Sequence, residues 1–216
     1  MTYLDENVKL VADIGGTHIR LAQSQGESVL AIEKYRCADH PTLADAINHY
    51  LQSHSLASID QACLAVAAAI NADEVIMTNS DWRFSMSKLK QQFDLSRLAV
   101  INDFEAVALA VPHLTPQDTI QLGGGEPDQQ GNIVVLGPGT GLGVKHLTPT
   151  VDGWKVLTGE GGHVDFAPVD ENDIVLWHHM QAQMQPIAIE EILSGRGLVQ
   201  IYNSIVSRKQ VSAQFF

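Results

Sequence analysis

The sequence predicts an α/β protein built from two related domains, and two observations carry this prediction. Apolar runs of strand length alternate with segments whose apolar residues recur at helical spacing. In addition, one succession of strand, Gly-Thr turn, strand, turn and strand occurs at Lys9–Tyr35 and again at Asn132–Thr158. Because such self-similarity indicates repeated architecture, we expect a small α/β domain at residues 1–116 and a second, larger one beginning at residues 117–216.

The first half begins with three extended runs and continues with alternating helices and strands. Pro41-Thr42 precedes apolar residues spaced three and four positions apart, which predicts a helix. The other expected elements are the runs Lys9–Ile14, Ile19–Ala22 and Ser28–Tyr35, a buried strand at Ala62–Ala69, a short strand at Glu74–Met77, a helix at Lys88–Phe93 capped by Ser85 or Ser87, a strand at Leu98–Ile101 and a helix after Asp103. This order favours an antiparallel hairpin with a mainly parallel extension.

The second half repeats the three-stranded opening after a polar, glycine-rich loop at Gly123–Gly131. It then adds expected helices at Glu171–Met184 and Ile187–Arg208, the latter interrupted at Ser194–Gly197. By analogy with the first half, further strands and helices should follow, and the sequence ends without them. We therefore expect the second domain to be incomplete and the chain to be truncated at its C-terminus.

Composition excludes several classes of partner and location. The 216 residues include 13 Lys and Arg against 25 Asp and Glu, and the net charge of −12 argues against a nucleic-acid or acidic-membrane partner. Cys37 and Cys63 have no CxxC spacing, so we expect reduced thiols in a cytoplasmic protein. The N-terminus lacks the pattern of a signal peptide, and no apolar run approaches the ~18 residues that span a bilayer.

Two glycine-rich turns are candidates for phosphate binding. Gly15-Gly16-Thr17 and Gly139-Thr140-Gly141 each follow a strand, and amides of residues without a Cβ can approach an anion closely. The alternative is an ordinary hairpin turn, but two copies facing each other would grip a polyphosphate from both sides. Asp13, at the end of the first strand, could hold Mg²⁺ through water.

Polar residues near these turns are candidates for catalysis. Asp103 stands between a strand and a helix, where an ionised carboxylate could accept a proton from an attacking hydroxyl; the alternative is a helix-capping Asp. Considered without its neighbours, Asn102 is typical of a turn, and Glu190 is typical of a charged residue on the surface of a helix. Glu160 and His163 flank two glycines and could line a polar pocket or a solvent-exposed loop.

Most of these residues lie in segments that together resemble bacterial glucokinases, members of the hexokinase–actin-like superfamily of duplicated ribonuclease-H-like domains. The matching segments are Ala12–Thr17, Ile101–Phe104, Gly139–Val144, Glu160–Pro168 and Leu193–Gly195. The run Glu-Gly-Gly-His-Val-Asp-Phe-Ala-Pro is highly specific, whereas the Gly-Gly-Thr turn alone suggests only the superfamily. The resemblance covers Lys9 to Arg208, and family members continue well beyond Phe216.

The resemblance implies a cytoplasmic glycolytic kinase that uses ATP and Mg²⁺ to phosphorylate glucose at its 6-hydroxyl. It assigns Asp103 as the base, and it assigns as glucose ligands Asn102, Asp103, Glu160, His163 and Glu190. It assigns to the ATP phosphates Ala12, Asp13, Ile14, Gly15, Gly16, Thr17, Gly139, Thr140 and Gly141, with Asp13 reaching the metal through water. It also implies a homodimer for the full-length protein.

The sequence departs from the family pattern at several positions. These are His18, where Asn is usual, Ala69 and Ala72, which replace a Pro and a Gly, Lys145, where a small residue is usual, and Arg196, where Pro is common. The departures at His18 and in the loop leave open an alternative: a non-catalytic sugar-binding or sensor protein of the same fold. Activity of this chain by itself is a separate question, because the missing part would carry the adenosine site.

Overall fold

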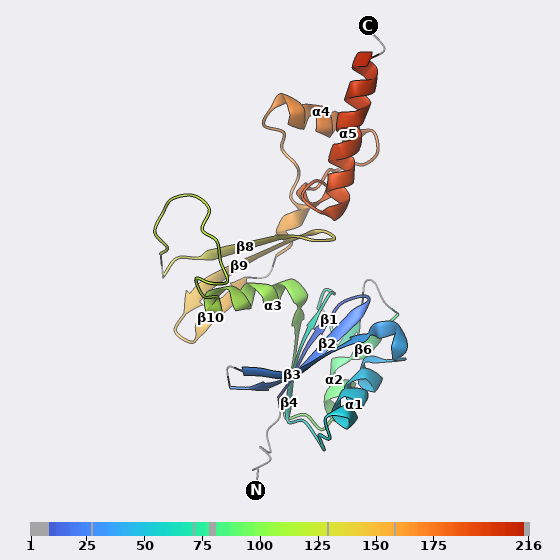
Figure 1. Ribbon diagram of the computed structural model, residues 1–216, viewed down its shortest axis with the longest axis vertical. Coiled ribbons are helices and arrows are strands. Elements are labelled where there is room, and N and C mark those ends of the chain that lie inside the picture. The colour runs from blue at the N-terminus through green and yellow to red at the C-terminus, as the bar shows by residue number, and fades with distance from the viewer. Residues whose placement is uncertain are drawn as a thin grey trace. The chain divides into compact units, whose positions relative to one another are not determined.

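The chain folds as two compact units. The computed structural model describes residues 9–26, 28–70, 72–77, 81–128, 130–157 and 159–213, with side chains as far as residue 207. The units divide between Val107 and Ala108, and Figure 1 colours the first from blue to green and the second from green to red. The domain boundary expected between residues 116 and 117 stays a prediction.

The first unit is built on a sheet with the strand order β3-β2-β1-β4-β7. Its strands are β1 (Lys9–Ile14), β2 (His18–Gln25), β3 (Ser28–Arg36), β4 (Gln61–Val66) and β7 (Arg97–Asn102). The first three pair antiparallel, and β4 and β7 extend the sheet parallel to β1. The predicted antiparallel hairpin with a parallel extension is therefore confirmed.

The helices of the first unit begin at capping residues that the sequence identifies. The unit contains α1 (Leu43–Ser53), α2 (Met86–Gln92), the start of α3 (Asp103–Ala110) and a short 3₁₀ helix at Cys37–Asp39. The Thr42 hydroxyl accepts from the amide of Asp45, and the Ser85 hydroxyl accepts from the amide of Lys88, each at 3.2 Å. Of the two proposed caps for α2, Ser85 is thus the one that bonds a first-turn amide.

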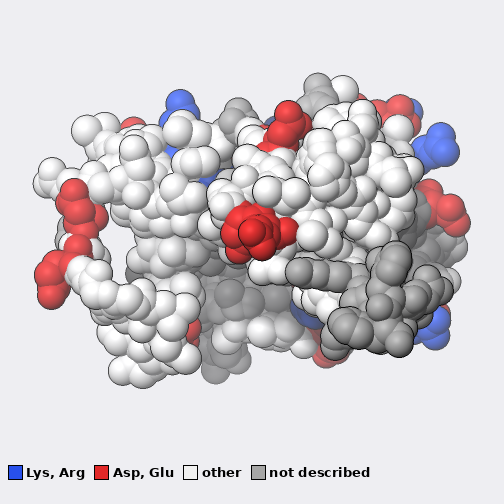
Figure 2. All heavy atoms as spheres, turned by 90° about the horizontal axis from the view of Figure 1, so that it is seen from above, with Lys and Arg blue, Asp and Glu red and all other residues white. Residues whose placement is uncertain are grey.

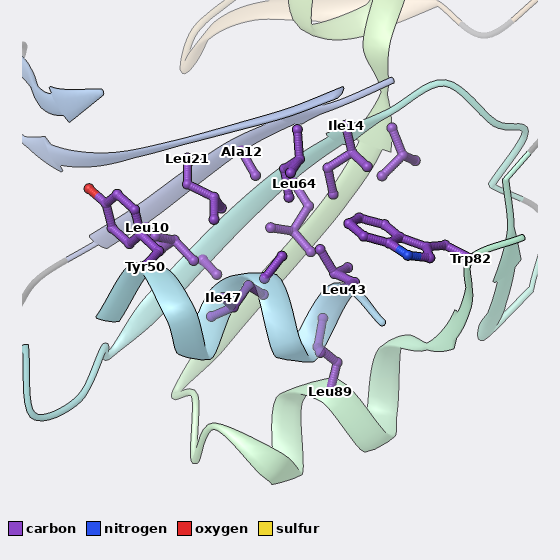
Figure 3. Close-up of a cluster of buried hydrophobic side chains, with 14 of the residues drawn as sticks. Leu10, Ala12, Ile14, Leu21, Leu43, Ile47, Tyr50, Leu64, Trp82 and Leu89 are labelled. Atoms are coloured by element: carbon purple, nitrogen blue, oxygen red, sulfur yellow. The ribbon is translucent and has the colours of Figure 1, made fainter. Parts of the chain in front are cut away.

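One hydrophobic core lies between this sheet and α1 and α2 (Figure 3). Alternate residues of β1, namely Leu10, Ala12 and Ile14, are buried and face α1. Helix α1 contributes Ile47 and Tyr50, both buried, as the spacing of its apolar residues predicts. Because the side-chain period of a strand is two, burying one face of β1 specifies its register.

A second, smaller hairpin joins β4 to α2. It consists of β5 (Glu74–Ile76) and β6 (Arg83–Ser85), which pair antiparallel. The sequence predicts β5, but β6 is only three residues long and carries no alternating apolar pattern. Its pairing with β5 makes it a strand, so local sequence gives no sign of it.

The second unit also begins with an antiparallel three-stranded sheet. The strands are β8 (Ile133–Pro138), β9 (Leu142–Thr150) and β10 (Gly153–Leu157), with β9 in the middle. The helical elements are α4 (Glu171–Gln181), α5 (Gly195–Ala213) and 3₁₀ helices at Val111–His113, Gly161–His163 and Ile189–Glu191. Both units thus open as predicted for duplicated ribonuclease-H-like domains.

The last helix starts later than the sequence predicts, and this prediction is corrected. The expected start was Ile187, whereas α5 begins at Gly195. The intervening backbone pairs with another segment, because Phe166 donates to the carbonyl of Ile187 and Ile189 donates to the carbonyl of Val164, each at 2.8 Å. The carbonyl of Ile187 is therefore not available to an intrahelical hydrogen bond, and only the short 3₁₀ helix Ile189–Glu191 forms between Ile187 and α5.

The surface agrees with the acidic composition. On the face shown in Figure 2, charged side chains stand singly among uncharged ones, and the described residues form no basic cluster there. Within the described part of the chain, no helix is both long and apolar enough to cross a membrane.

Candidate functional site

The carboxyl ends of β1, β4 and β7 meet at one edge of the first sheet. Ile14, the last residue of β1, pairs with Val66 of β4, and Val66 pairs with Asn102 of β7. The Gly-Gly-Thr turn leaves β1 at this edge, and Asp103 follows Asn102 directly. Ligands of open α/β sheets gather beyond the carboxyl ends of the strands. The first predicted phosphate turn and the predicted base therefore share the edge at which a ligand would bind.

The first turn is compact and anchored. The amide of Gly15 donates to the carbonyl of His18 at 2.9 Å, which closes the turn between β1 and β2. The carbonyl of Thr17 accepts from the amide of Cys37, also at 2.9 Å. The turn is thus tied to the segments on both sides, as a backbone that holds an anion without rearranging should be.

Asn102 and Asp103 have different hydrogen-bonding roles at the start of α3. The Asn102 side-chain oxygen accepts from the amides of Phe104 and Glu105, at 3.1 and 3.3 Å, so Asn102 caps the helix. Its Nδ2 donates to Asp103 Oδ1 at 3.0 Å and to the carbonyl of Ala68 at 3.3 Å. Asp103 Oδ1 also accepts from the amide of Phe104 at 2.8 Å. Among the described residues, Asp103 Oδ2 has no partner, so one carboxylate oxygen is left to face a substrate.

The second predicted phosphate turn joins β8 to β9. The amide of Gly139 donates to the carbonyl of Gly141 at 2.8 Å, and the carbonyl of Gly139 accepts from Gly195, the first residue of α5, at 2.8 Å. The amide of Leu142, just after the turn, donates to Glu190 Oε2 at 3.3 Å. A Cβ on Gly141 would lie 2.5 Å from this oxygen, so a larger residue there would displace the carboxylate from the turn.

Glu190 also meets His163 and Arg196. Its Oε1 lies 3.5 Å from His163 Nε2 and 2.8 Å from a terminal nitrogen of the Arg196 guanidinium. The Glu190 side chain is only 17% exposed, whereas that of His163 is 62% exposed. Two predicted sugar ligands, Glu190 and His163, are therefore brought together beside the second turn.

Glu160 lies close in sequence but makes different contacts. Its carbonyl accepts from the amide of His163 at 3.1 Å, which starts the short helix Gly161–His163. Its side chain is 73% exposed and lies 4.0 Å from the ammonium of Lys145. The carboxylate thus projects to solvent, where a hydroxyl-bearing ligand could reach it.

Lys145 and Arg196 contact predicted site residues, although their sequence positions suggested only departures from a family pattern. Lys145 is buried and donates to the carbonyl of Gly159 at 3.1 Å. The strand periodicity contained this signal, because Lys145 lies two positions before the buried Leu147 on β9. Arg196 follows two adjacent glutamates by five and six residues, and no periodicity links them across the intervening turn.

Asp13, the residue expected to reach Mg²⁺ through water, pairs with Arg20 on the neighbouring strand at 2.6 Å. Among the described residues, no group of three or more His, Cys, Asp or Glu side chains is placed to enclose a metal ion. Magnesium keeps several waters and commonly takes one or two carboxylates together with substrate phosphates. The described residues thus form no all-protein metal cage, and the Asp13 carboxylate would have to share its charge between Arg20 and a water-bound ion.

Of the two cysteines, Cys37 contacts the first turn, because its thiol donates to the carbonyl of Gly15 at 3.5 Å, whereas Cys63 lies on β4. Both Cys37 and Cys63 are free, as the sequence predicts. Burial raises the pKa of each thiol, and at Cys63 the carboxylate of Glu105 adds to this while Arg97 opposes it. A raised pKa reduces the thiolate fraction, so neither cysteine is suited to act as a nucleophile.

Comparison with known proteins identifies the glucokinase family. The model of the glucokinase family matches residues 10–215. The glucokinase of Colwellia psychrerythraea is 43% identical over 201 residues, which cover 92% of this chain and 61% of that protein. The chain thus spans about three fifths of the length of this curated relative.

Solved structures agree with the sequence match. A glucokinase from an Antarctic psychrotroph superimposes with a TM-score of 0.85 at 35% identity, covering 94% of this chain and 66% of that one. A glucokinase from Balamuthia mandrillaris, solved in complex with glucose, superimposes with a TM-score of 0.67 at 25% identity, covering 96% of this chain and 66% of that one.

Proposed function

Because the chain belongs to the glucokinase family, we propose that its protein transfers the γ-phosphoryl group of ATP to the 6-hydroxyl of glucose. In this reaction the bond between the sugar oxygen and phosphorus forms, the bond from phosphorus to the β-phosphate oxygen breaks, and ADP leaves. The proton of the sugar hydroxyl passes to a base. The chemistry requires positioning and charge stabilisation more than covalent catalysis.

The observation that carries this proposal is the shared edge of the first sheet. Strand register puts Asn102 level with Ile14 across the intervening β4, so Asp103 and the turn that begins at Gly15 lie at the same end of the sheet, two strands apart. One oxygen of Asp103 is held by Asn102 and by the amide of Phe104, and the other has no partner among the described residues. A carboxylate fixed in this way is suited to accept the hydroxyl proton.

The second unit supplies groups for the sugar and for the phosphates. Sugar hydroxyls need fixed donors and acceptors, and Glu190 and His163 form such a pair beside the Gly139–Gly141 turn. Glu160 adds an exposed acceptor. The amides of Gly15 and Gly139 bond within their own turns, so each turn has its remaining amides to offer to a phosphate. Mg²⁺, when bound, would neutralise phosphate charge, and Asp13 would hold it through water.

The proposal extends to location and assembly. Two free thiols and an acidic surface suit a cytoplasmic enzyme. For the full-length protein we propose a homodimer, with glucose and ATP as its ligands and no nucleic-acid partner. Sedimentation of the purified full-length protein tests the dimer, and a monomer at micromolar concentration would reject it.

Substitution Asp103→Asn in the full-length protein tests the function. General-base catalysis contributes about 10²- to 10⁴-fold, so we expect kcat for glucose phosphorylation to fall by about 10³-fold. Glucose affinity should change much less, because Asn retains a hydrogen-bonding side chain. A coupled spectrophotometric assay measures the first quantity and calorimetry the second. Glu105→Gln, two residues further along α3, serves as the matched control.

The same experiment separates the kinase from a non-catalytic sugar-binding protein. A wild-type full-length protein that binds glucose but phosphorylates no hexose would reject the kinase proposal in favour of that alternative. If the wild type phosphorylates glucose and the Asp103→Asn variant keeps that activity, the assignment of Asp103 as the base is rejected, but the kinase proposal stands.

A further inference from the structure

We propose that Arg196 is a positioning residue for sugar binding, because it holds the Glu190 carboxylate between the Gly139–Gly141 turn and His163. The inference rests on the proposed function insofar as Glu190 contacts the sugar. The claim that Arg196 on α5 sets the direction of the Glu190 carboxylate depends only on the contacts between these residues.

The geometry leaves the Glu190 carboxylate little freedom. Oε1 receives the Arg196 guanidinium at 2.8 Å and faces His163 Nε2 at 3.5 Å. Oε2 accepts from the amide of Leu142 at 3.3 Å and packs against Gly141. Of these three groups, Arg196 makes the shortest contact and carries a permanent positive charge, so it has the largest influence on how the carboxylate points.

Arg196 also removes a conflict of charge. Glu190 and Glu191 are adjacent, and their side chains are only 17% and 22% exposed. The same guanidinium nitrogen lies 2.8 Å from Glu190 and 2.7 Å from Glu191. Like charges at this spacing repel, and a shared cation offsets the repulsion. Without Arg196, the Glu190 carboxylate would be expected to turn away from Glu191 and from its place beside the turn.

The position of Glu190 links the two predicted subsites of this unit. The carboxylate contacts the end of the phosphate turn through Leu142 and the sugar side through His163. A change in its direction should therefore be detectable at the Leu142 amide and, independently, in the affinity for sugar. These two readouts distinguish positioning from a general loss of stability.

The test uses Arg196→Met, Arg196→Lys and Glu191→Gln. In ¹H–¹⁵N spectra of this chain, we expect Arg196→Met to move the Leu142 amide signal in the direction that Glu190→Gln moves it. In the full-length protein, calorimetry should show about tenfold weaker glucose binding, the effect of losing one charge-assisted hydrogen bond. Arg196→Lys should recover most of the affinity. Glu191→Gln keeps the pair between Arg196 and Glu190 and should leave both readouts near wild type.

The outcomes separate this inference from the proposed function. An unmoved Leu142 signal in a folded Arg196→Met variant would overturn the inference, whatever happens to glucose affinity. A moved signal with unchanged glucose affinity would overturn the role in sugar binding. A moved signal in a protein whose wild type binds no sugar would uphold the contact between Arg196 and Glu190 and reject the proposed function.

Discussion

Lys145 shows how a single buried cation shapes this site. Its ammonium has two neighbours among the described residues, the carbonyl of Gly159 at 3.1 Å and the carboxylate of Glu160 at 4.0 Å. The Lys145 side chain is 11% exposed while that of Glu160 is 73% exposed. Because the Glu160 side chain is so exposed, its ion pair with Lys145 adds little to the stability of the fold. Lys145 therefore matters mainly because it fixes the backbone from which Glu160 and His163 project.

Substitution Lys145→Met should separate the charge of this residue from its packing. Met fills a similar volume, so we expect the free energy of unfolding to change by no more than about 1 kcal/mol. Glucose affinity in the full-length protein should fall, because Gly159 and Glu160 lose their anchor. Urea unfolding and calorimetric titration measure the two effects.

Lys145→Ala provides the matched comparison, since it removes both charge and volume. We expect this variant to lose about 2 kcal/mol or more of stability through the cavity it leaves. If Lys145→Met binds glucose as tightly as the wild type, Lys145 does not position Glu160.

At the scale of residues, the sequence predicted which side chains carry chemistry better than how they are held. Gly139–Gly141, His163 and Glu190 were recognisable by residue type and by family resemblance, and the structure brings them together. Arg196 and Lys145 act through contacts with residues distant in the sequence or across a turn. Such contacts depend on tertiary packing, so spacing could show that Lys145 shares a strand face with Leu147, but not which residues Lys145 and Arg196 contact.

Among the elements, Asp73 ties the β5–β6 hairpin to α2. Its Oδ1 accepts from the amide of Ser87 at 2.8 Å, and its Oδ2 accepts from the hydroxyls of Ser85 and Ser87. The hydrogen bond from Ser85, followed by that from the Ser87 amide, lowers the pKa of Asp73 below its ordinary value of 3.8. One carboxylate thus serves the start of a helix and the end of a strand.

The lowered pKa predicts how acid affects this part of the fold. A carboxyl group whose folded pKa lies below its unfolded value stabilises the protein fully above the unfolded value and loses this contribution as pH falls through the folded one. We therefore expect Asp73→Asn to reduce stability at pH 7 and to diminish the loss of stability below about pH 4. Urea unfolding of both proteins between pH 7 and pH 3 measures the difference. If the free energy of unfolding falls equally with pH in the wild type and in Asp73→Asn over that range, Asp73 does not have this role.

Elements with strong local periodicity were predictable, and those created by pairing were not. Helix α1 and strand β1 have apolar spacing that matches the faces they bury. Strand β6 exists because it pairs with β5. The start of α5 is delayed because Ile187 and Ile189 pair with the segment Val164–Phe166. Hydrogen bonds between distant segments thus overrule the helical pattern that the local sequence suggests.

For the whole molecule, the two units differ in how much apolar surface they bury. The first unit has a continuous core contributed by its sheet and by α1 and α2. The buried cluster of the second unit comprises Leu176, Met180, Ile187 and Ile192. In the same unit, Val134 and Leu136 of β8 and Tyr202 of α5 are each more than half exposed. Because burial of apolar area is the main stabilising term, the first unit of this chain should be the more stable.

Hydrogen exchange on this chain tests the difference. Strands β1 and β9 are matched, because each lies inside its sheet with a hydrogen-bonded partner on both sides. Amides that open only on unfolding of their own unit report the stability of that unit. We expect the hydrogen-bonded amides of β1 to exchange at least about tenfold more slowly than those of β9, a difference of about 1.4 kcal/mol or more. Mass spectrometry of peptides covering each strand measures both rates in one sample. Equal rates would contradict the expected difference in stability between the two units.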